Sequence, residues 1–318
     1  MKKTHTKIQK WYQQYGRKTL PWRTTTDPYA IYLSEVMLQQ TQVKTVLERY
    51  YFPFLKRFPT LKELGKAPLD SVLKQWEGLG YYNRAKNLHK TASLIETLPQ
   101  EIEALMQLPG IGKNTAHAIA TFAFKQPVPI MEANVKRILC RLHKLSTPKE
   151  KKLWELAYQM VDKTDPFAYN QAMMDIGATL CTPKEPDCQQ CPLQAICQGK
   201  EIPLLYPIKK KRIVPTRETT VTLFIYQDRV ALAQRSGKFL HGLWGFETTQ
   251  TPLCGSEYIG EVSHTYTHFK LHCKLWVYYE TQATQRHYFS LEEIAQLAIS
   301  KVDEKIIHQY MRTLTSNC

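Results

Sequence analysis

Half of the cysteines in this 318-residue chain fall within one short segment. They are Cys181, Cys188, Cys191 and Cys197, in the spacing C-x6-C-x2-C-x5-C, and prolines between them stiffen the loop. Four thiolates on one loop can enclose either a zinc ion or an iron–sulfur cluster. The spacing does not match the usual zinc pattern of two C-x2-C pairs. The residues therefore predict a metal-binding loop and leave these two ligands open.

The first 200 residues are expected to be helical. Apolar side chains recur every three or four positions, as in Leu69, Val72, Leu73 and Trp76, and prolines punctuate the segments. Stretches rich in β-branched residues are few. The pattern therefore predicts an all-α region built from short helices.

The residue pattern changes after position 199. Residues 202–216 contain three prolines and a basic run at 209–212, which indicates a linker. Strand-like runs follow at 220–226, 229–233 and 271–279, with Gln227 and Asp228 as a hairpin turn between the first two. Residues 291–297 predict a short helix with Ser290 as its N-cap and Glu293 three residues later. The second part is therefore expected to be an α+β domain.

The net charge of +15 is confined to one part of the chain. Basic and acidic residues are equal in number from position 217 onward, so the whole excess lies upstream. Such an imbalance favours contact with a polyanion, and a contribution to solubility is the alternative. The sequence contains no run of about 18 uncharged apolar residues and no secretory signal, so no membrane span is predicted. We therefore expect a cytoplasmic protein with reduced cysteines.

Residues 108–113, with the sequence L-P-G-I-G-K, place two glycines one residue apart directly before a predicted helix. Gly110 and Gly112 permit a partner to approach the backbone closely, and the start of the helix offers N–H groups. Lys113 adds a positive charge. The segment therefore predicts contact with a phosphodiester, and a simple tight turn is the alternative.

Two acidic residues are candidates for proton transfer. Glu35 lies among apolar residues in a predicted helix over 31–43, where burial would raise its pKa and make it a proton donor near neutral pH. An exposed Glu35, or one paired with an arginine, is the alternative. Glu132 follows an extended segment and opens the next helix. Two converging acids suit glycosidic chemistry, in which one protonates the leaving group and the other stabilises positive charge on the sugar.

These features together resemble the MutY-type adenine DNA glycosylases of the helix-hairpin-helix superfamily. The resemblance covers nearly the whole chain and rests on residues 34–43, 78–88, 108–113 and 170–178 and on the cysteine loop. It implies a multi-domain fold, in which an all-α helix-hairpin-helix glycosylase region with a [4Fe–4S] loop precedes an α+β Nudix-like domain. The four cysteines match the ligands of the family's [4Fe–4S] cluster.

The resemblance implies the following domain organisation. Residues 1–200 form the helical catalytic region, 201–217 a linker, and 218–318 a Nudix-like domain that recognises 8-oxoguanine. Within the helical region, residues about 25–130 form the helix-hairpin-helix subdomain. Residues 1–24 and 131–200 form the iron–sulfur subdomain, and the active site lies in the cleft between the two.

The resemblance also implies the roles of the residues around the reacting base. Glu35 matches the acid that protonates adenine at N7, Glu132 the carboxylate that stabilises the sugar cation, and Asn134 an active-site asparagine. Trp22 and Gln171 match the lining of the adenine pocket. The implied reaction is hydrolysis of the N-glycosidic bond of adenine mispaired with 8-oxoguanine or guanine in double-stranded DNA, a step of base excision repair.

Other residues match those that contact the opposite strand. Gln40 and Tyr81 match residues inserted into the duplex beside the 8-oxoguanine. Tyr266, Thr267 and His268 match the loop that senses the oxidised base, which is often Phe-Ser-His in the family. We expect a DNA-associated monomer in the cytoplasm.

Two positions depart from the family pattern. The family carries Asp where this chain has Glu132, so either the backbone is displaced or the activity is reduced. Position 114 is Asn, whereas the related endonuclease III enzymes carry there the lysine that forms a Schiff base, so we expect base removal without strand cleavage. The alternatives are an endonuclease III-like glycosylase/lyase for oxidised pyrimidines and a lesion-binding protein weakened at position 132.

The C-terminal domain contains no G-x5-E-x7-R-E-x2-E-E segment. It therefore lacks the carboxylate cluster that holds magnesium in Nudix hydrolases. We expect it to recognise a base and not to hydrolyse phosphates.

Overall fold

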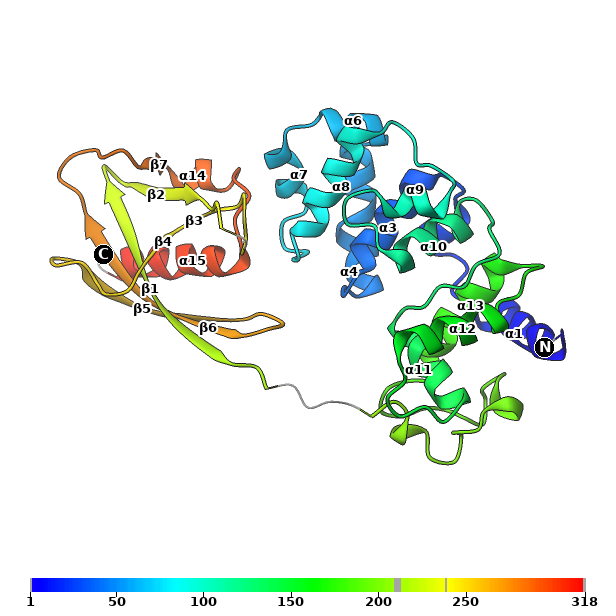
Figure 1. Cartoon of the computed structure of the whole chain (residues 1–318). Coiled ribbons are helices and arrows are strands. Elements are labelled where there is room, and N and C mark those ends of the chain that lie inside the picture. The colour runs from blue at the N-terminus through cyan, green and yellow to red at the C-terminus, as the bar shows by residue number, and fades with distance from the viewer. Residues whose placement is uncertain (1, 209–212, 238, 317–318) are drawn as a thin grey trace. The chain divides into compact units, whose positions relative to one another are not determined.

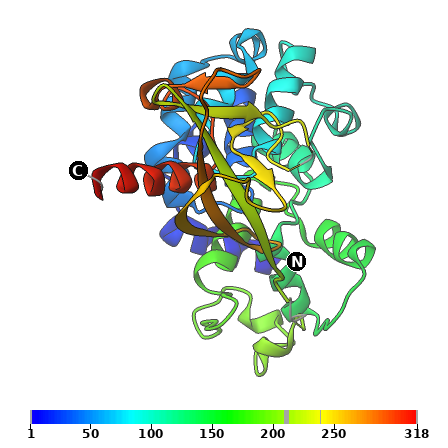
Figure 2. The ribbon, with the colours of Figure 1, turned by 90° about the vertical axis from the view of Figure 1, so that its left-hand side faces the viewer.

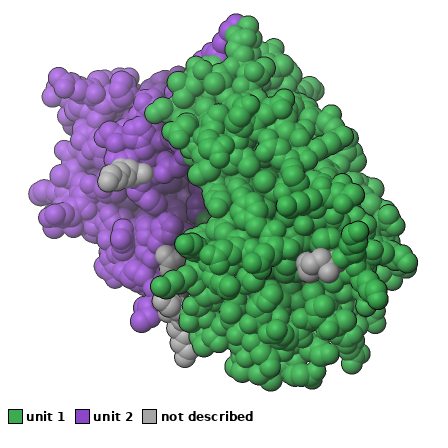
Figure 3. All heavy atoms as spheres, turned by 45° about the vertical axis from the view of Figure 1, so that its right-hand side comes forward, with its two compact units in different colours: residues 1–65, 90–210 green, residues 66–89, 211–318 purple. Residues whose placement is uncertain are grey.

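The computed structural model describes residues 2–208, 213–237 and 239–316. The chain forms two compact units, which Figure 3 shows in green and purple. Unit 1 contains residues 1–65 and 90–210, and unit 2 contains residues 66–89 and 211–318. Unit 2 thus combines a helical segment from the first third of the chain with the C-terminal residues. The basic run at 209–212 lies outside the described residues.

Up to position 208 the described residues form helices and turns, which confirms the predicted all-α region (Figure 1). The α-helices are α1 (Lys2–Tyr15), α2 (Pro21–Thr24), α3 (Pro28–Leu38), α4 (Val43–Arg49), α5 (Tyr51–Arg57), α6 (Leu61–Lys66), α7 (Leu69–Gln75), α8 (Asn83–Leu94), α9 (Ile102–Met106), α10 (Lys113–Phe122), α11 (Ala133–Leu142), α12 (Glu150–Met160) and α13 (Pro166–Thr179). Two 3-10 turns follow, η1 (Gln194–Ile196) and η2 (Pro203–Leu205).

An Asp-Pro pair starts two of the helices that carry candidate site residues. The Asp27 carboxylate accepts a hydrogen bond from the Tyr29 N–H (3.0 Å) at the start of α3, and the Asp165 carboxylate accepts one from the Ala168 N–H (3.0 Å) at the start of α13. A side-chain oxygen at the N-cap satisfies an N–H that has no partner within the helix, and proline at the first helical position has the required φ. Both helices therefore begin at a position fixed by local sequence.

The helix predicted over 31–43 is shorter in the structure. Helix α3 ends at Leu38, and a turn over 39–42 precedes α4. Gln40 within this turn has a left-handed backbone, with φ of 57°. The prediction was wrong for residues 39–42 because polar residues can follow an apolar helix either as another turn of helix or as a loop, and periodicity does not separate the two.

The larger core of unit 1 joins segments that are far apart in the sequence. Helices α1, α11, α12 and α13 pack around it, and α1 crosses α13 at the N-terminal end of the chain (Figure 1). A smaller cluster joins α3 to α10 through Ile31, Ala118 and Phe122. The N-terminal helix therefore packs against residues beyond position 131, and Glu35 and Gln171 are carried by different parts of the unit.

The C-terminal part of unit 2 is a mixed sheet with helices, which confirms the predicted α+β domain. Its strands are β1 (Thr216–Tyr226), β2 (Arg229–Gln234), β3 (Trp244–Gly245), β4 (Glu247–Thr249), β5 (Glu257–Thr265), β6 (Lys270–Tyr279) and β7 (His287–Phe289). The strand order is β3-β2-β1-β6-β5, with β1 and β6 parallel and the β1–β2 and β5–β6 pairs antiparallel. Helix α15 (Lys301–Ser316) packs against β5 (Figure 2).

The local predictions for this domain differ from the structure mainly at the ends of elements. Gln227 and Asp228 both have positive φ between paired Tyr226 and Arg229, which confirms the hairpin turn. Ser290 forms the predicted capping box, but helix α14 (Leu291–Ile294) ends before the expected position 297. The linker expected to extend to 217 ends earlier, because β1 begins at Thr216 and pairs with β6 from its first residue.

Among the helices of the described residues, none is both long enough and apolar enough to cross a bilayer.

Candidate active site

The Glu35 carboxyl lies in an apolar environment on α3. Its neighbours in the helix are almost fully buried, with Ser34 at 1% and Val36 at 5% exposure. Burial, and then the negative charge of Glu132, raise the pKa of Glu35 to about 7, although Arg23 acts in the opposite direction. The side chain keeps some accessible surface. The group is therefore a carboxylic acid that holds a proton near neutral pH and can still reach a ligand.

Two asparagine side chains fix the extended segment that leads to Glu132. The Asn170 Oδ1 accepts a hydrogen bond from the Ile130 N–H (2.8 Å), and the Asn114 Oδ1 accepts one from the Met131 N–H (2.7 Å). Ile130 and Met131 are buried, so their N–H groups need partners inside the protein. Asn114 therefore helps to set the backbone just before Glu132.

A chain of hydrogen bonds holds the Glu132 carboxylate. The Asn134 amide donates to Glu132 Oε1 (2.9 Å), and the Arg137 guanidinium donates to Asn134 Oδ1 (2.8 Å). Arg137 also donates to the carbonyl oxygens of Gly177 (2.6 Å) and Cys181 (2.7 Å). Burial raises the pKa of Glu132, and the Asn134 hydrogen bond and the nearby arginines oppose this effect. The carboxylate held in this way adds to the effect of burial on Glu35, because its negative charge raises the Glu35 pKa.

Helix α13 approaches α11 closely because residue 177 is glycine. A Cβ atom at Gly177 would lie 2.4 Å from the Cβ of Asn134, a distance that real side chains do not adopt. Asn134 occupies the space that this side chain would fill. The orientation of Asn134, and through it of Glu132, therefore depends on a residue of another helix.

A buried ion cluster joins the N-terminal segment to α13. The Arg23 guanidinium donates to both oxygens of Asp175 (2.7 and 2.9 Å), and Arg17 donates to the same carboxylate through its backbone N–H (2.9 Å) and its Nε (2.7 Å). Asp175 is 1% exposed and Arg23 is 8% exposed. The cluster fixes the neighbouring Trp22, whose ring meets that of Tyr51 edge to face at 5.2 Å.

Gln171 lies one helical turn before Asp175 on the same face of α13. It is 2% exposed, and among the described residues its Oε1 has no hydrogen-bond partner. A buried acceptor without a partner is costly, typically by about 1–3 kcal/mol. Because Asp175 binds the residue next to Trp22, Gln171 and Trp22 belong to the same part of unit 1. The Gln171 oxygen is therefore a candidate acceptor for a donor on a bound molecule.

The glycine hairpin has the predicted form. Gly110 has φ of 74°, which favours glycine, and Gly112 is the N-cap of α10. A Cβ atom at Gly112 would meet nothing within 4 Å, so the fold leaves open space beside this backbone. The Lys113 ammonium lies 4.2 Å from the centre of the Trp154 ring. The two glycines thus present backbone N–H groups, while Lys113 contacts an aromatic residue of α12.

The two residues expected to enter the duplex share an unusual backbone. Gln40 and Tyr81 have φ of 57° and 50°, in the left-handed region that non-glycine residues rarely adopt. Gln40 is exposed. Strained backbone of this kind is often found at binding sites. Gln40 belongs to unit 1 and Tyr81 to unit 2, so each unit carries one of these two residues.

Thr267 and His268 occupy the tip of the hairpin between β5 and β6. The Tyr266 N–H donates to the Phe269 carbonyl (2.9 Å) and closes the turn. The Thr267 hydroxyl lies 2.9 Å from His268 Nδ1, and both side chains are exposed. The Tyr266 ring packs against Phe269 at a centroid distance of 5.0 Å. The turn therefore exposes a hydroxyl and an imidazole to solvent, and the packed rings of Tyr266 and Phe269 support it.

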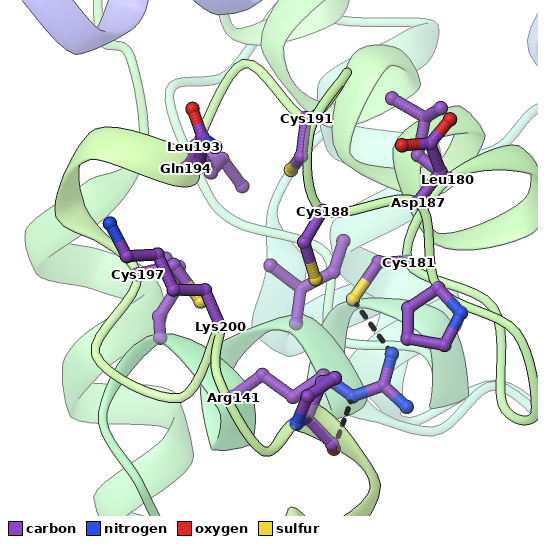
Figure 4. Close-up of a pocket in the computed structure, with 14 residues that line it drawn as sticks. Arg141, Leu180, Cys181, Asp187, Cys188, Cys191, Leu193, Gln194, Cys197 and Lys200 are labelled. Atoms are coloured by element: carbon purple, nitrogen blue, oxygen red, sulfur yellow. Dashed lines mark hydrogen bonds between the residues drawn. The ribbon is translucent and has the colours of Figure 1, made fainter.

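The four clustered cysteines line one cavity. Cys181, Cys188, Cys191 and Cys197 line one pocket, and Figure 4 shows their side chains around it. They come from the end of α13 and the loop around η1. Residues that are spaced unevenly in the sequence thus meet around one volume, as the sequence predicted for a shared ligand.

Arg141 of α11 connects this loop to the helices. It is 3% exposed, and its Nη1 donates to Cys181 Sγ at 3.2 Å (Figure 4). The same Nη1 donates to the Thr182 carbonyl (2.8 Å). Its Nε donates to the Pro203 carbonyl (2.9 Å). A buried guanidinium beside a sulfur favours negative charge in the cavity. The donor set therefore fits an anionic group held by thiolates.

Sequence reasoning missed several residues that shape the site. Arg137, Arg23 and Asp175 gave no motif of their own, and Asn170 was part of a matching segment without an assigned role. Their partners lie more than 30 residues away in most cases, as with Arg23 and Asp175, which are 152 positions apart. A charged residue inside an otherwise apolar helix, such as Asp175 in α13, was the available signal.

Two protein families match the chain. Residues 33–163 match the HhH-GPD superfamily base excision DNA repair proteins, and residues 220–309 match the NUDIX domain. The adenine DNA glycosylase of Buchnera aphidicola subsp. Baizongia pistaciae is 39% identical over 249 residues, which cover 74% of this chain and 70% of that protein. The human adenine DNA glycosylase is 30% identical over 405 aligned residues, covering 97% of this chain and 74% of the human protein.

The helical region also resembles solved structures. A thermostable thymine-DNA glycosylase is 28% identical, with a TM-score of 0.58, and the match covers 63% of this chain and 97% of that one. An endonuclease III from a DNA complex shares the fold at 20% identity, with a TM-score of 0.52 over 62% of this chain and 92% of that one.

The ion cluster around Asp175 generates a stability prediction. The arginines and the Arg17 N–H, against the effect of burial, leave the pKa of Asp175 below its usual value. Asp175→Asn leaves the buried Arg23 without its counter-charge, so we expect the free energy of unfolding to fall by about 3–5 kcal/mol. Urea unfolding at neutral pH measures the change. Glu155→Gln, in an exposed pair 3.9 Å from Lys152, is the matched control and should change stability by less than about 1 kcal/mol. Equal effects of the two substitutions would contradict the prediction.

Proposed function

The chain belongs to the adenine DNA glycosylase family, and we propose that it hydrolyses the N-glycosidic bond of adenine mispaired with 8-oxoguanine or guanine in duplex DNA. The observation that carries this proposal is the pair of interacting acids. Glu35 has its pKa raised to about 7 by burial and by the charge of Glu132. Two acids whose environments differ are the arrangement that glycoside hydrolysis requires.

The two acids take different roles in the proposed reaction. Glu35 holds its proton near neutral pH and delivers it to N7 of adenine, which makes the base a better leaving group. Glu132, bound by Asn134 and near three arginines, acts in its ionised form and stabilises the positive charge that develops on the sugar. Water then completes the hydrolysis. Because position 114 is Asn, the site contains no lysine there to form a Schiff base, and the strand stays intact.

The pocket for the flipped base is proposed to lie beside Trp22 and Gln171. An adenine base must leave the helix before these acids reach it, at a cost of a few kcal/mol. The ring of Trp22 offers a flat apolar wall, and the free Oε1 of Gln171 suits the exocyclic amino group of adenine. The base thus supplies the donor that this buried oxygen lacks among the residues that the structure describes.

Contacts with the DNA backbone and the opposite strand complete the proposed complex. The N–H groups at Gly110 and Gly112 bind a phosphate, and the excess positive charge of the first 216 residues attracts the duplex. Lys113 supports this contact from its position over Trp154. Gln40 and Tyr81 enter the DNA duplex beside 8-oxoguanine and replace part of the base stacking that is lost when adenine leaves the duplex.

We propose that the C-terminal domain reads the base opposite the adenine. The exposed hydroxyl and imidazole of Thr267 and His268 can donate to and accept from the edge of 8-oxoguanine. The domain carries no excess charge, which suits reading a base and not general binding of phosphates. We also propose that the helical region divides into residues 25–130 and residues 1–24 with 131–200.

The cysteine loop is proposed to hold a [4Fe–4S] cluster through Cys181, Cys188, Cys191 and Cys197. When bound, the cluster fixes the loop and gives the protein a redox-active iron centre. The anionic character of such a group fits the buried Arg141 beside Cys181. Arg141 and Arg137 then connect the loop to α11, which carries Asn134.

The proposed acid role of Glu35 predicts a pH dependence. The rate of adenine release under single-turnover conditions should fall as pH rises through about 7, because Glu35 then loses the proton that it must donate. On the acid side the rate should fall where Glu132 becomes protonated, above the usual carboxyl range because its pKa is raised. Glu35→Gln should slow release by about 100- to 10,000-fold.

These rates are measured on duplexes that hold A:8-oxoguanine, A:G and A:C, with alkali added afterwards to reveal the abasic product. Glu292→Gln, an exposed acid of α14, is the matched control and should leave the rates unchanged. A Glu35→Gln protein as fast as the parent would contradict the assignment of the acid. Strand cleavage without alkali would favour the lyase alternative.

The unpaired oxygen of Gln171 predicts a base-specific effect. Gln171→Leu should slow release of adenine by roughly tenfold, because the contact with the amino group is lost. Release of unsubstituted purine, which lacks this amino group, should change much less. Single-turnover rates for the two bases in the same sequence give the comparison, with Gln159→Leu on the exposed face of α12 as control. Equal slowing of both bases would show that Gln171 acts only through the fold.

The cysteine assignment predicts the metal content. The purified parent should contain iron and acid-labile sulfide in equal amounts, and Cys191→Ser should lower both because one ligand is lost. Cys254→Ser, an exposed cysteine in unit 2, should leave both unchanged. Zinc in place of iron in the parent would contradict the proposal.

A further inference from the structure

Segment 297–299 of unit 2 is attached on one side to the C-terminal sheet. The Trp244 N–H donates to the Ala298 carbonyl (2.9 Å), and Trp244 forms a parallel β-bridge with Ile299. Trp244 belongs to β3 at one end of the strand order. The segment therefore lies next to the sheet edge and is bound to it.

The other side of the segment contacts side chains of the early helical segment in the same unit. Lys74 Nζ donates to the Leu297 carbonyl (3.1 Å), and the Ile299 N–H donates to Glu77 Oε1 (3.3 Å). The Tyr82 hydroxyl donates to the Ile299 carbonyl (3.3 Å). Lys74 and Glu77 also form an ion pair at 2.6 Å. Three backbone groups of segment 297–299 are thus bound by side chains that lie more than 200 positions earlier in the chain.

Those side chains lie on either side of a tight turn at 78–81. The Gly78 N–H donates to the Tyr82 hydroxyl (3.3 Å), so this one hydroxyl joins the turn to segment 297–299. Gly78, Gly80 and Tyr81 have φ of 84°, 75° and 50°. A turn with this backbone, and with a non-glycine residue in the left-handed region, needs contacts from outside to hold it.

Two further side chains hold the turn from its other side. Trp76 Nε1 and the Arg84 guanidinium each donate to the Gly80 carbonyl, both at 3.1 Å. The Arg84 guanidinium also lies between two rings, 5.4 Å from the centre of Trp76 and 5.3 Å from that of Tyr81. The orientation of the Tyr81 ring therefore depends on the position of the turn.

We propose that segment 297–299 docks on Lys74, Glu77 and Tyr82 and thereby holds turn 78–81, which carries the half-buried Tyr81, in one conformation. The C-terminal domain then acts on the reaction in two ways, through the loop that reads the opposite base and through the residue that enters the duplex. Tyr82 is a positioning residue in this arrangement. The inference rests on the proposed function, in which Tyr81 is inserted beside 8-oxoguanine.

A second set of contacts also joins the early segment to the sheet. Gln234 Nε2 donates to Asp70 Oδ1 (3.3 Å), and Lys86 Nζ lies 2.7 Å from His241 Nδ1. Gln234 ends β2 and is the register partner of Trp244, and His241 lies in the loop before β3. The early segment is thus bound through residues of β2 and of this loop as well as through segment 297–299.

The test uses the full chain and the substitution Tyr82→Phe, which keeps the buried ring and removes the bridging hydroxyl. Hydrogen exchange should become about three- to tenfold faster at the amides of 78–81, the loss expected for one or two hydrogen bonds. The ratio of single-turnover rates for A:8-oxoguanine over A:G should fall by a similar factor, because Tyr81 is then less well placed. The melting temperature serves as a check that the fold is intact.

Tyr279→Phe is the matched control, because its hydroxyl belongs to a ring that is 55% exposed on β6. It should change neither the exchange nor the ratio. If Tyr82→Phe does not fold, Lys74→Met removes the contact to the Leu297 carbonyl from a side chain that is one-third exposed. The same two changes are expected from it.

If hydrogen exchange at the amides of 78–81 is unchanged in Tyr82→Phe, the docking does not hold the turn. If exchange becomes faster but the ratio of the A:8-oxoguanine rate to the A:G rate is unchanged, the docking has no effect on recognition of the opposite base. The exchange measurement needs no enzymatic activity. A parent protein that releases adenine from neither duplex would therefore refute the proposed function, while the docking would still be decided by exchange.

Discussion

The Asp175 carboxylate, bound by Arg17 and Arg23, is the interaction on which the arrangement of the candidate active site depends. It joins the residues before α3 to α13, two segments that share no local sequence relation. Three charged groups are tolerated in this buried place because each guanidinium is hydrogen-bonded to the carboxylate. The packing of α1 on α13 brings the two segments together, and the ion cluster binds the residue next to Trp22 to the helix that carries Gln171.

The same cluster also affects the chemistry. Burial raises the pKa of both Glu35 and Glu132, and the positive charge of Arg23 opposes this effect at each of them. Glu132 also receives a hydrogen bond from Asn134 and lies near Arg137, which oppose the effect of burial further. The two acids therefore share one buried environment and differ in the hydrogen bonds and charges that act against burial.

Local features of the sequence predicted the local features of the structure. The cysteine spacing indicated four side chains around one volume, and the L-P-G-I-G-K segment indicated a glycine turn at a helix start, because both depend on residues that are neighbours in the chain. The end of α3 at Leu38 was missed, since the polar residues after it are compatible with helix or turn. The roles of Arg137, Asn114 and Asn170 were missed for a different reason. Their partners are set by the packing of helices, which no short segment of sequence specifies.

The grouping of residues 66–89 with the C-terminal domain is a second case in which the sequence did not reveal contacts between distant segments. Lys74, Glu77 and Tyr82 occur in ordinary helical and turn sequence, and their partners are backbone groups, which carry no signature in the sequence. A side chain that binds a carbonyl or an N–H of a distant segment is insensitive to the residue type found there. Sequence comparison of positions 297–299 would therefore not identify this contact, although the backbone there must keep its path. The C-terminal domain can accordingly vary in sequence and still hold turn 78–81, provided that the segment after α14 reaches the same three side chains.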